Sequence, residues 1–96
     1  MELVSTSFEN GGMIPGRYTC DGVNHSPPLS WSGLPEATVT VALICDDPDA
    51  PIRTWVHWVA YDLPASVTEL PEGVPAEKVL DNGGKQGVGS SRKIGY

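Results

Sequence analysis

The sequence predicts an all-β domain, a sandwich or a barrel, on three observations. Eleven Gly and nine Pro divide the 96 residues into short segments, as turns do between short strands. Two segments, 38–46 and 55–63, are rich in the β-branched and aromatic residues that favour strands. Helix signals are weak, because prolines and a glycine interrupt 65–79 and leave room there for one short helical turn. A chain of this length is enough for one domain.

The two strand segments are expected to be neighbours in a sheet. Residues 38–46 are apolar on both faces, which predicts a central strand. Residues 55–63 alternate, so successive side chains are expected to point to opposite faces. One face then carries Trp55, His57, Val59 and Tyr61, and the other carries Val56, Trp58, Ala60 and Asp62. The connection over 47–54 is too long for a tight hairpin.

Shorter elements are expected on either side of this pair. Residues 3–8 are predicted to form a first strand, which the turn residues Asn10, Gly11 and Gly12 would close. Residues 27–31 are expected to be extended, because a residue before proline is pushed out of the helical region. Residues 81–89 are interpreted as a glycine-rich loop.

The acidic composition excludes some classes of protein. Six Lys and Arg against twelve Asp and Glu give a net charge of −6, which argues against non-specific nucleic-acid binding and against a polybasic membrane anchor. A single local anion site remains compatible with this charge. The longest apolar run is 41–45, so we expect no transmembrane segment. The opening M-E-L-V-S lacks the positive region of a secretory leader, and we expect a cytoplasmic protein.

The cysteines and histidines show no established metal or cofactor motif. Cys20 and Cys45 are too far apart for a C-x-x-C motif, and Cys45 is expected to be a small buried hydrophobe. A disulfide between them lacks the support of a secretory context. His25, His57 and the nearby aspartates lack the spacing of zinc or calcium sites, so we expect neither a metal nor another cofactor.

The segment G-V-G-S-S-R-K-I-G, which ends at Gly95, contains two serines but no nucleophile motif. It has no G-x-S-x-G and no strand–turn–helix context, and it lacks the G-K-[ST] ending of a phosphate-binding loop. We interpret it as a flexible loop and expect no catalytic residue in it.

His57 lies in an apolar strand ten residues after Asp47. The periodicity alone favours an ordinary packed histidine, and a catalytic base is the remotest of the alternatives. If Asp47 or Asp49 accepts a hydrogen bond from one ring nitrogen, it fixes the tautomer and favours the charged form. The other nitrogen would then donate to an anion, while the remaining carboxylate could hold an ammonium group.

Three segments occur in this order: I-P-G-R-Y-T-C-D-G-V-N-H-S-P-P-L-S-W, then D-D-P-D-A-P, then T-W-V-H-W-V-A-Y-D-L-P. Together they resemble the phosphatidylethanolamine-binding protein (PEBP) family, and more closely its bacterial and archaeal branch called Raf-kinase-inhibitor-like. The resemblance implies an antiparallel β-sandwich of the Greek-key type with a small anion pocket at one end. This chain of 96 residues would be a single domain, incomplete, corresponding to the N-terminal portion of the family domain.

The resemblance also implies the residues of a site. The family's pocket aspartate falls on Asp47 and its companion on Asp49, and its motif proline, wall tryptophan and pocket histidine fall on Pro51, Trp55 and His57. The pair of Gly95 and Tyr96 resembles the start of the family's next motif, so Tyr96 is added to the expected ligand-binding residues.

Members of the family bind phosphate, acetate or phosphoethanolamine-like groups, and some eukaryotic members inhibit kinases. We therefore expect a non-enzymatic binding protein for a small anion or a phospholipid head group. The alternative is a protein–protein regulator of the kinase- or protease-inhibitor type.

The sequence departs from the family pattern at its end. The family continues past G-Y with G-P-x-P-P-x-G and an H-R-Y segment, whereas this chain stops at Tyr96. Two interpretations follow: the chain is a fragment or truncated product, or it pairs with another copy or another piece that completes its sheets.

Overall fold

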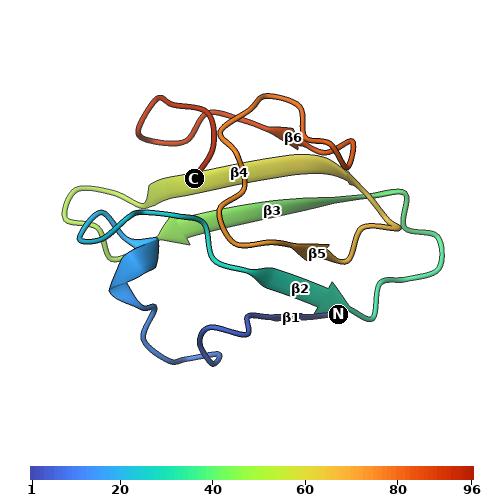
Figure 1. The fold of residues 1–96 in the computed structure, drawn as a ribbon, viewed down its shortest axis with the longest axis horizontal. Helices are drawn as coiled ribbons and strands as arrows, with labels where there is room; N and C mark the ends of the chain where they lie inside the picture. Colours follow the sequence, from blue (N-terminus) through green and yellow to red (C-terminus); the bar gives the residue numbers. More distant parts are fainter. The chain divides into compact units, whose positions relative to one another are not determined.

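Two antiparallel sheets of three strands each, and no α-helix, make up the fold of the computed structural model, which describes residues 1–96 (Figure 1). The chain forms two compact units that are interleaved along the sequence. The first unit comprises residues 1–38 and 66–74, and the second comprises residues 39–65 and 75–96. The predicted all-β class and antiparallel pairing are confirmed.

The first unit contains the sheet β1-β2-β5, whose strands are short. β1 (Glu2–Val4) and β5 (Glu69–Leu70) pair antiparallel with opposite edges of β2 (Leu29–Ser32). A 3-10 turn, η1 (Gly16–Tyr18), lies between β1 and β2. The first strand is therefore shorter than expected, and the helical turn expected in 65–79 is replaced by β5. A two-residue strand leaves no periodicity that a sequence pattern could reveal.

Side-chain bonds join segments of the first unit that are distant in the sequence. The carbonyl and the hydroxyl of Ser26, a buried residue, accept hydrogen bonds of 2.9 Å from the backbone N–H groups of Gly73 and Val74, respectively. Glu72 forms an ion pair of 2.6 Å with Arg17. These contacts hold β5 and the residues after it against the earlier part of the unit.

The second unit contains the sheet β3-β4-β6. β4 (Trp55–Pro64) lies between β3 (Thr40–Asp47) and β6 (Lys85–Gln86), and all pairs are antiparallel. β3 and β4 are neighbours, as expected. The expectation that 38–46 forms the central strand is wrong: β3 is an edge strand, and its outward face is exposed, with Ile44 at 62%. A strand sequence that is apolar at successive positions can be buried on both faces, or can leave one apolar face exposed. The pattern alone does not distinguish these two cases.

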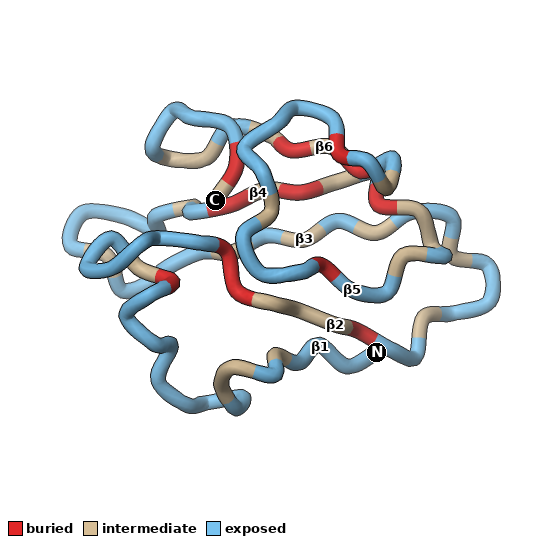
Figure 2. The backbone as a smooth tube through the Cα atoms, in the orientation of Figure 1, coloured by how far each residue is buried: buried red, intermediate tan, exposed pale blue.

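The core of the second unit lies on one face of β4. Trp58, Ala60 and Leu63 are fully buried, whereas Trp55 and His57 at the start of the strand are exposed (Figure 2). This alternation confirms the expected assignment of faces as far as Ala60.

The pairing of β3 with β4 contains two β-bulges, and the extra residue belongs to β4 each time. Cys45 is opposite Trp58, but the next residue, Asp46, is opposite Val56, so His57 has no counterpart on β3. The second bulge places two residues, Tyr61 and Asp62, opposite Ala42, and Asp62 has a left-handed φ of 52°. Bulges redirect side chains locally, and sequence alternation does not reveal them.

The predicted glycine-rich loop over 81–89 contains β6 and continues along β4. The N–H of Gly87 donates to the carbonyl of Val59 at 2.9 Å, and an isolated antiparallel bridge pairs Val88 with Ile94. The segment after β6 is thus tied to the edge of β4, which bears on the site described next.

Candidate functional site

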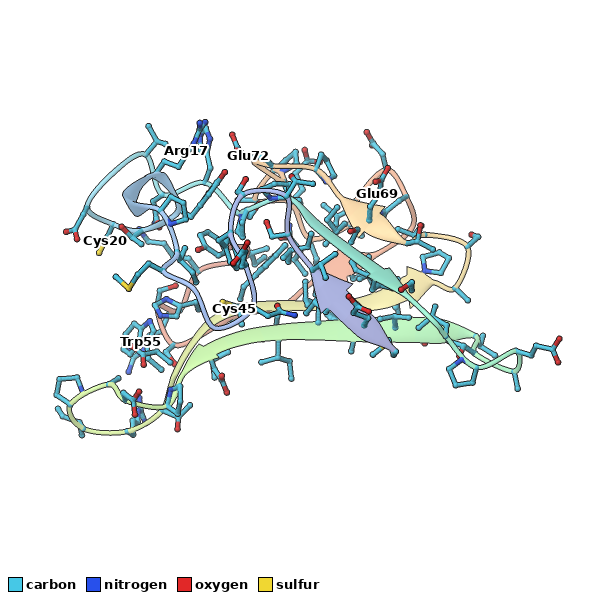
Figure 3. All side chains as sticks on the ribbon, turned by 90° about the horizontal axis from the view of Figure 1, so that it is seen from below. Arg17, Cys20, Cys45, Trp55, Glu69 and Glu72 are labelled. Atoms are coloured by element: carbon cyan, nitrogen blue, oxygen red, sulfur yellow. The ribbon has the colours of Figure 1, made fainter.

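The predicted site residues, except Tyr96, lie where β3 ends and β4 begins. Asp47 is the last residue of β3 and is directly opposite Trp55, the first residue of β4. Asp49 and Pro51 lie in the turn that connects the two strands, and His57 follows two residues into β4. Figure 3 shows Trp55 beside this exposed turn. All five residues belong to the second unit.

The two aspartates form a local turn. The backbone N–H of Asp49 donates to Oδ1 of Asp47 at 3.0 Å. The carboxylate of Asp47 thus accepts a hydrogen bond from the backbone two residues later in the chain. Asp and Asn side chains commonly stabilise turns in this way. Both residues are exposed, so one oxygen of Asp47 and the carboxylate of Asp49 face solvent.

Trp55 and His57 form the aromatic part of the site. Their ring centroids are 6.5 Å apart and their planes make an angle of 64°, an edge-type contact. Trp55 is 36% exposed and His57 is exposed as well. His57 is therefore not the packed interior histidine that the periodicity favoured, and its ring is accessible to a ligand.

The structure brings the aspartates together and the two rings together, but it forms no hydrogen bond or ion pair between His57 and either Asp47 or Asp49. The expected hydrogen bond from the His57 ring to a carboxylate therefore stays a prediction.

Tyr96 lies against the core of the second unit. Its ring meets the ring of Trp58 edge-on, with centroids 5.6 Å apart and planes at 88°. Burial, with a smaller contribution from Cys45, raises the pKa of Tyr96 to about 12. The hydroxyl therefore remains protonated, and able to donate a hydrogen bond, across the whole physiological pH range.

The cysteines are both free thiols, Cys20 exposed and Cys45 half-buried. Burial, and secondarily the charge of Asp46, raises the pKa of Cys45. Cys45 therefore stays a neutral thiol at neutral pH, which fits a packing role better than a nucleophilic one.

One residue that the sequence did not single out as part of the site is Ser90. Its hydroxyl accepts a hydrogen bond of 2.8 Å from the N–H of Val56, and its own N–H donates to the carbonyl of Val56 at 2.7 Å. Val56 directly precedes the bulged His57. The interpretation of this segment as a flexible loop did not anticipate these bonds, because no local pattern marks a contact over 34 residues.

Cations gather in the segments that meet at this end of β4. Half of the six Lys and Arg residues of the chain are Arg53, in the turn before β4, and Arg92 and Lys93, just after Ser90. All three are exposed, and none takes part in an ion pair. No three His, Cys, Asp or Glu side chains come together in a way that could hold a metal ion.

Comparison with known proteins identifies the family of this chain. The family model described as phosphatidylethanolamine-binding protein matches residues 4–96, which is nearly the whole chain. This chain belongs to the phosphatidylethanolamine-binding protein family.

Relatives and solved structures support the same assignment. A UPF0098 protein of Methanothermobacter thermautotrophicus is 50% identical over the full chain, which covers 64% of that protein. A UPF0098 protein of Aquifex aeolicus is also 50% identical, with 56% of it covered. The crystal structure of CT736, a PEBP homolog from Chlamydia trachomatis, matches with a TM-score of 0.85 and 38% identity over 98% of this chain and 61% of that one.

A second crystal structure, YbcL of E. coli, described as a member of the mammalian PEBP family, has a TM-score of 0.86 and 32% identity. That match covers 99% of this chain and 63% of YbcL. The chain thus spans less than two thirds of the length of these relatives.

None of its helices is long and apolar enough to cross a membrane.

Proposed function

We propose that this chain contributes the binding site of a non-enzymatic protein that takes up a small anion, either phosphate or the phosphoethanolamine-like head group of a phospholipid. The ligand-binding residues are Asp47, Asp49, Pro51, Trp55 and His57, with Tyr96 as a further member from the core side. The observation that carries the proposal is the exposed ring of His57, which lies beside the ring of Trp55 at the open end of the β3–β4 pair.

The charges near the site are of both signs and suit a zwitterionic ligand. A protonated His57 would donate two N–H groups and three unpaired cations lie in the adjoining segments, and the aspartates Asp46, Asp47 and Asp49 are exposed there as well. The free carboxylate of Asp49 offers a partner for an ammonium group. A zwitterionic head group satisfies both ends, whereas phosphate uses only the cationic one.

Binding is tested by titrating the 96-residue protein with phosphate and, separately, with phosphoethanolamine, while the His57 imidazole signals are followed by NMR. We expect both ligands to shift these signals. His57→Gln should abolish the response. The matched control is His25→Gln, because His25 is the only other histidine and lies in the first unit.

A variant that lacks the Asp49 carboxylate distinguishes a phospholipid head group from free phosphate as the ligand. Asp49→Asn should weaken phosphoethanolamine binding more than phosphate binding, because only the former carries an ammonium group. Equal effects on both ligands would indicate a simple phosphate site. Absence of any His57 shift with either ligand, or hydrolysis of phosphate esters that His57→Gln removes, would contradict the proposal of a non-enzymatic anion site.

A second candidate function is a protein–protein regulator of the kinase- or protease-inhibitor type. The feature that favours it is Ile52, 95% exposed at the tip of the turn that flanks the site. Pro51 and Trp55 of the same segment are exposed as well, so that a partner would cover several apolar side chains beside the site. Inhibition of a kinase or a serine protease that Ile52→Ser weakens, while phosphate binding is kept, would support this function; lack of inhibition across both classes would refute it.

We also propose that a second copy of the chain pairs with the free edge of β3. The backbone groups on the side of β3 away from β4 have no strand partner, and Val39 and Ile44 next to them are 79% and 62% exposed. Such an edge favours pairing with another strand. In a two-fold antiparallel β3–β3 pair, the acidic ends at Asp46 and Asp47 would point in opposite directions, so like charges would not face each other.

Sedimentation at increasing protein concentration tests the pairing. Ile44→Lys should shift the equilibrium toward the monomer, because a charge on the edge opposes strand addition. Ile52→Lys, in the turn rather than on the edge, is the control and should not. A wild-type protein that stays monomeric at all concentrations would exclude the pairing. We further propose a cytoplasmic location, and that residues 1–96 form a single PEBP-like domain that corresponds to the N-terminal portion of the family domain.

A further inference from the structure

The start of β4, where His57 is bulged, is held from the side opposite β3. On that side, the backbone of Val56 is bonded at both of its polar groups to one residue, Ser90. The two bonds, of 2.8 Å and 2.7 Å, replace the strand pairing that β6 provides farther along β4. Both backbone polar groups of Val56 are therefore satisfied on the edge away from β3, while its neighbour His57 has no counterpart on β3.

Ser90 itself is held by a small hairpin. The bridge between Val88 and Ile94 closes the base of this hairpin. The N–H of Arg92 donates to the carbonyl of Gly89 at 3.0 Å and closes a turn at its tip, with Arg92 at a left-handed φ of 65°. A non-glycine residue in this conformation is uncommon and persists where surrounding contacts impose it.

Gly89 is required for this close approach. A Cβ atom built on Gly89 would lie 2.6 Å from the carbonyl oxygen of Val56 and 3.4 Å from the carbonyl carbon of His57. Both neighbours are backbone atoms, so they cannot rotate away. Any larger residue at this position would therefore push the hairpin and β4 apart.

We propose that Ser90 is the positioning residue of the anion site: its paired bonds to Val56, at the close approach that Gly89 permits, hold the residue between Trp55 and His57 and so fix the edge-type contact of the two rings. This inference rests on the proposed function for its consequence in binding, but the positioning itself can be observed without a ligand. Ser90 need not touch the anion.

The test compares Ser90→Ala, Ser90→Thr and Ser91→Ala in the full chain. Alanine at 90 removes the side-chain acceptor of Val56 N–H and keeps the backbone bond, so the fold should be retained. Threonine restores the hydroxyl. Ser91 is exposed and makes no side-chain hydrogen bond, so it is the matched control. Gly89→Ala is a second disrupting variant that acts by the steric route.

The primary measurement is the NMR spectrum of His57 and Trp55 without ligand. Ser90→Ala and Gly89→Ala should displace the His57 ring signals, because the ring leaves its edge-on position over Trp55, and Ser90→Thr should restore them. The second measurement is phosphate titration. Ser90→Ala should weaken phosphate binding about three- to tenfold, because the net contribution of one lost hydrogen bond corresponds to a change in affinity of this size. Ser91→Ala should match the wild type in both.

The outcomes separate the two proposals. Unchanged His57 signals in Ser90→Ala would overturn the positioning role, whether or not phosphate binds. A second outcome is that Ser90→Ala displaces the His57 signals and Ser90→Thr restores them, while the protein never responds to phosphate. This outcome would support the positioning role and refute the anion site. Lower stability alone, with His57 signals unchanged, would assign Ser90 a purely structural role and would also overturn the inference.

Discussion

At the scale of single residues, Gln86 shows how a polar side chain can be fully buried at no net penalty. Its amide Nε2 donates to the carbonyls of Pro75 and Glu77 at 2.7 and 2.8 Å, and its Oε1 accepts from the indole N–H of Trp58 at 2.7 Å. Buried polar groups are stable when each has a partner, and expensive when one is removed.

Gln86→Leu should therefore lower the free energy of unfolding by about 2–4 kcal/mol, because it leaves the Trp58 N–H and two carbonyls without their partner. Gln86→Glu should be at least as damaging at neutral pH, since a carboxylate cannot donate to the two carbonyls. Urea unfolding measures both. Glu77→Ala, which keeps the accepting carbonyl, is the control, and an equal loss in that variant would contradict the assignment.

Tyr96 gives a pH dependence of known sign. Its pKa, 10.0 in an unperturbed tyrosine, is raised to about 12 by burial and by Cys45. Between these two values the folded protein binds more protons than the unfolded chain does, so stability must fall as the pH rises. The wild type should lose stability between pH 10 and 12 more steeply than Tyr96→Phe, which keeps the ring contact with Trp58. Unfolding curves across this interval that run parallel would contradict the shift.

At the scale of elements, the strength of the strand signal determined what could be predicted. β3 and β4 were located within two residues at each end because each holds many β-branched and aromatic residues, whereas β5 and β6 have two residues each and escaped notice. The edge position of β3 was missed because sheet order depends on the rest of the chain.

The sequence predicted which residues of the proposed site would lie together, but not the backbone contacts that hold them. The aspartates, Trp55 and His57 stood out through their spacing and family resemblance, and the structure does gather them at one end of β4. The bulge at His57 and the contact with Ser90 were invisible, because both arise from hydrogen bonds between segments far apart in the sequence.

The second bulge provides a test of backbone strain. Asp62 has a left-handed φ of 52° and forms an exposed ion pair of 3.2 Å with Lys85. Asp62→Gly should change stability by less than about 1 kcal/mol, because the loss of a surface ion pair is offset by relief of the backbone conformation. Asp62→Val should cost about 2 kcal/mol more than Gly, since a β-branched residue tolerates this conformation poorly.

Urea unfolding of Asp62→Asn separates the two contributions, since asparagine tolerates the conformation but carries no charge. Its stability should lie close to that of Asp62→Gly. A valine variant as stable as the glycine variant would show that the bulge relaxes to an ordinary strand.

At the scale of the whole molecule, the chain passes between the two units three times, after Thr38, Ala65 and Val74. Neither unit is a continuous piece of sequence, and the proposed single domain requires that they unfold together. Trp31 lies in the first unit and Trp58 in the second, and both are buried. They are therefore natural reporters for the two units.

Labelling with fluorotryptophan should give separate ¹⁹F signals for these residues without any substitution. We expect the signals of Trp31 and Trp58 to disappear with the same urea midpoint, as in a two-state transition. Two distinct midpoints would show that residues 1–96 behave as two cooperative units rather than one domain.

The pairing of β2 with β5 has a consequence for the order in which the chain folds during synthesis. Leu29 and Leu70 are partners, but every residue of β3 and β4 lies between them in the sequence. On the ribosome, the β3–β4 hairpin can therefore form once Pro64 has emerged, while β2 still lacks one of its two neighbours. Local strand pairs form faster than distant ones. The sheet β1-β2-β5 therefore stays incomplete until residues 69–70, which form β5, have left the ribosome.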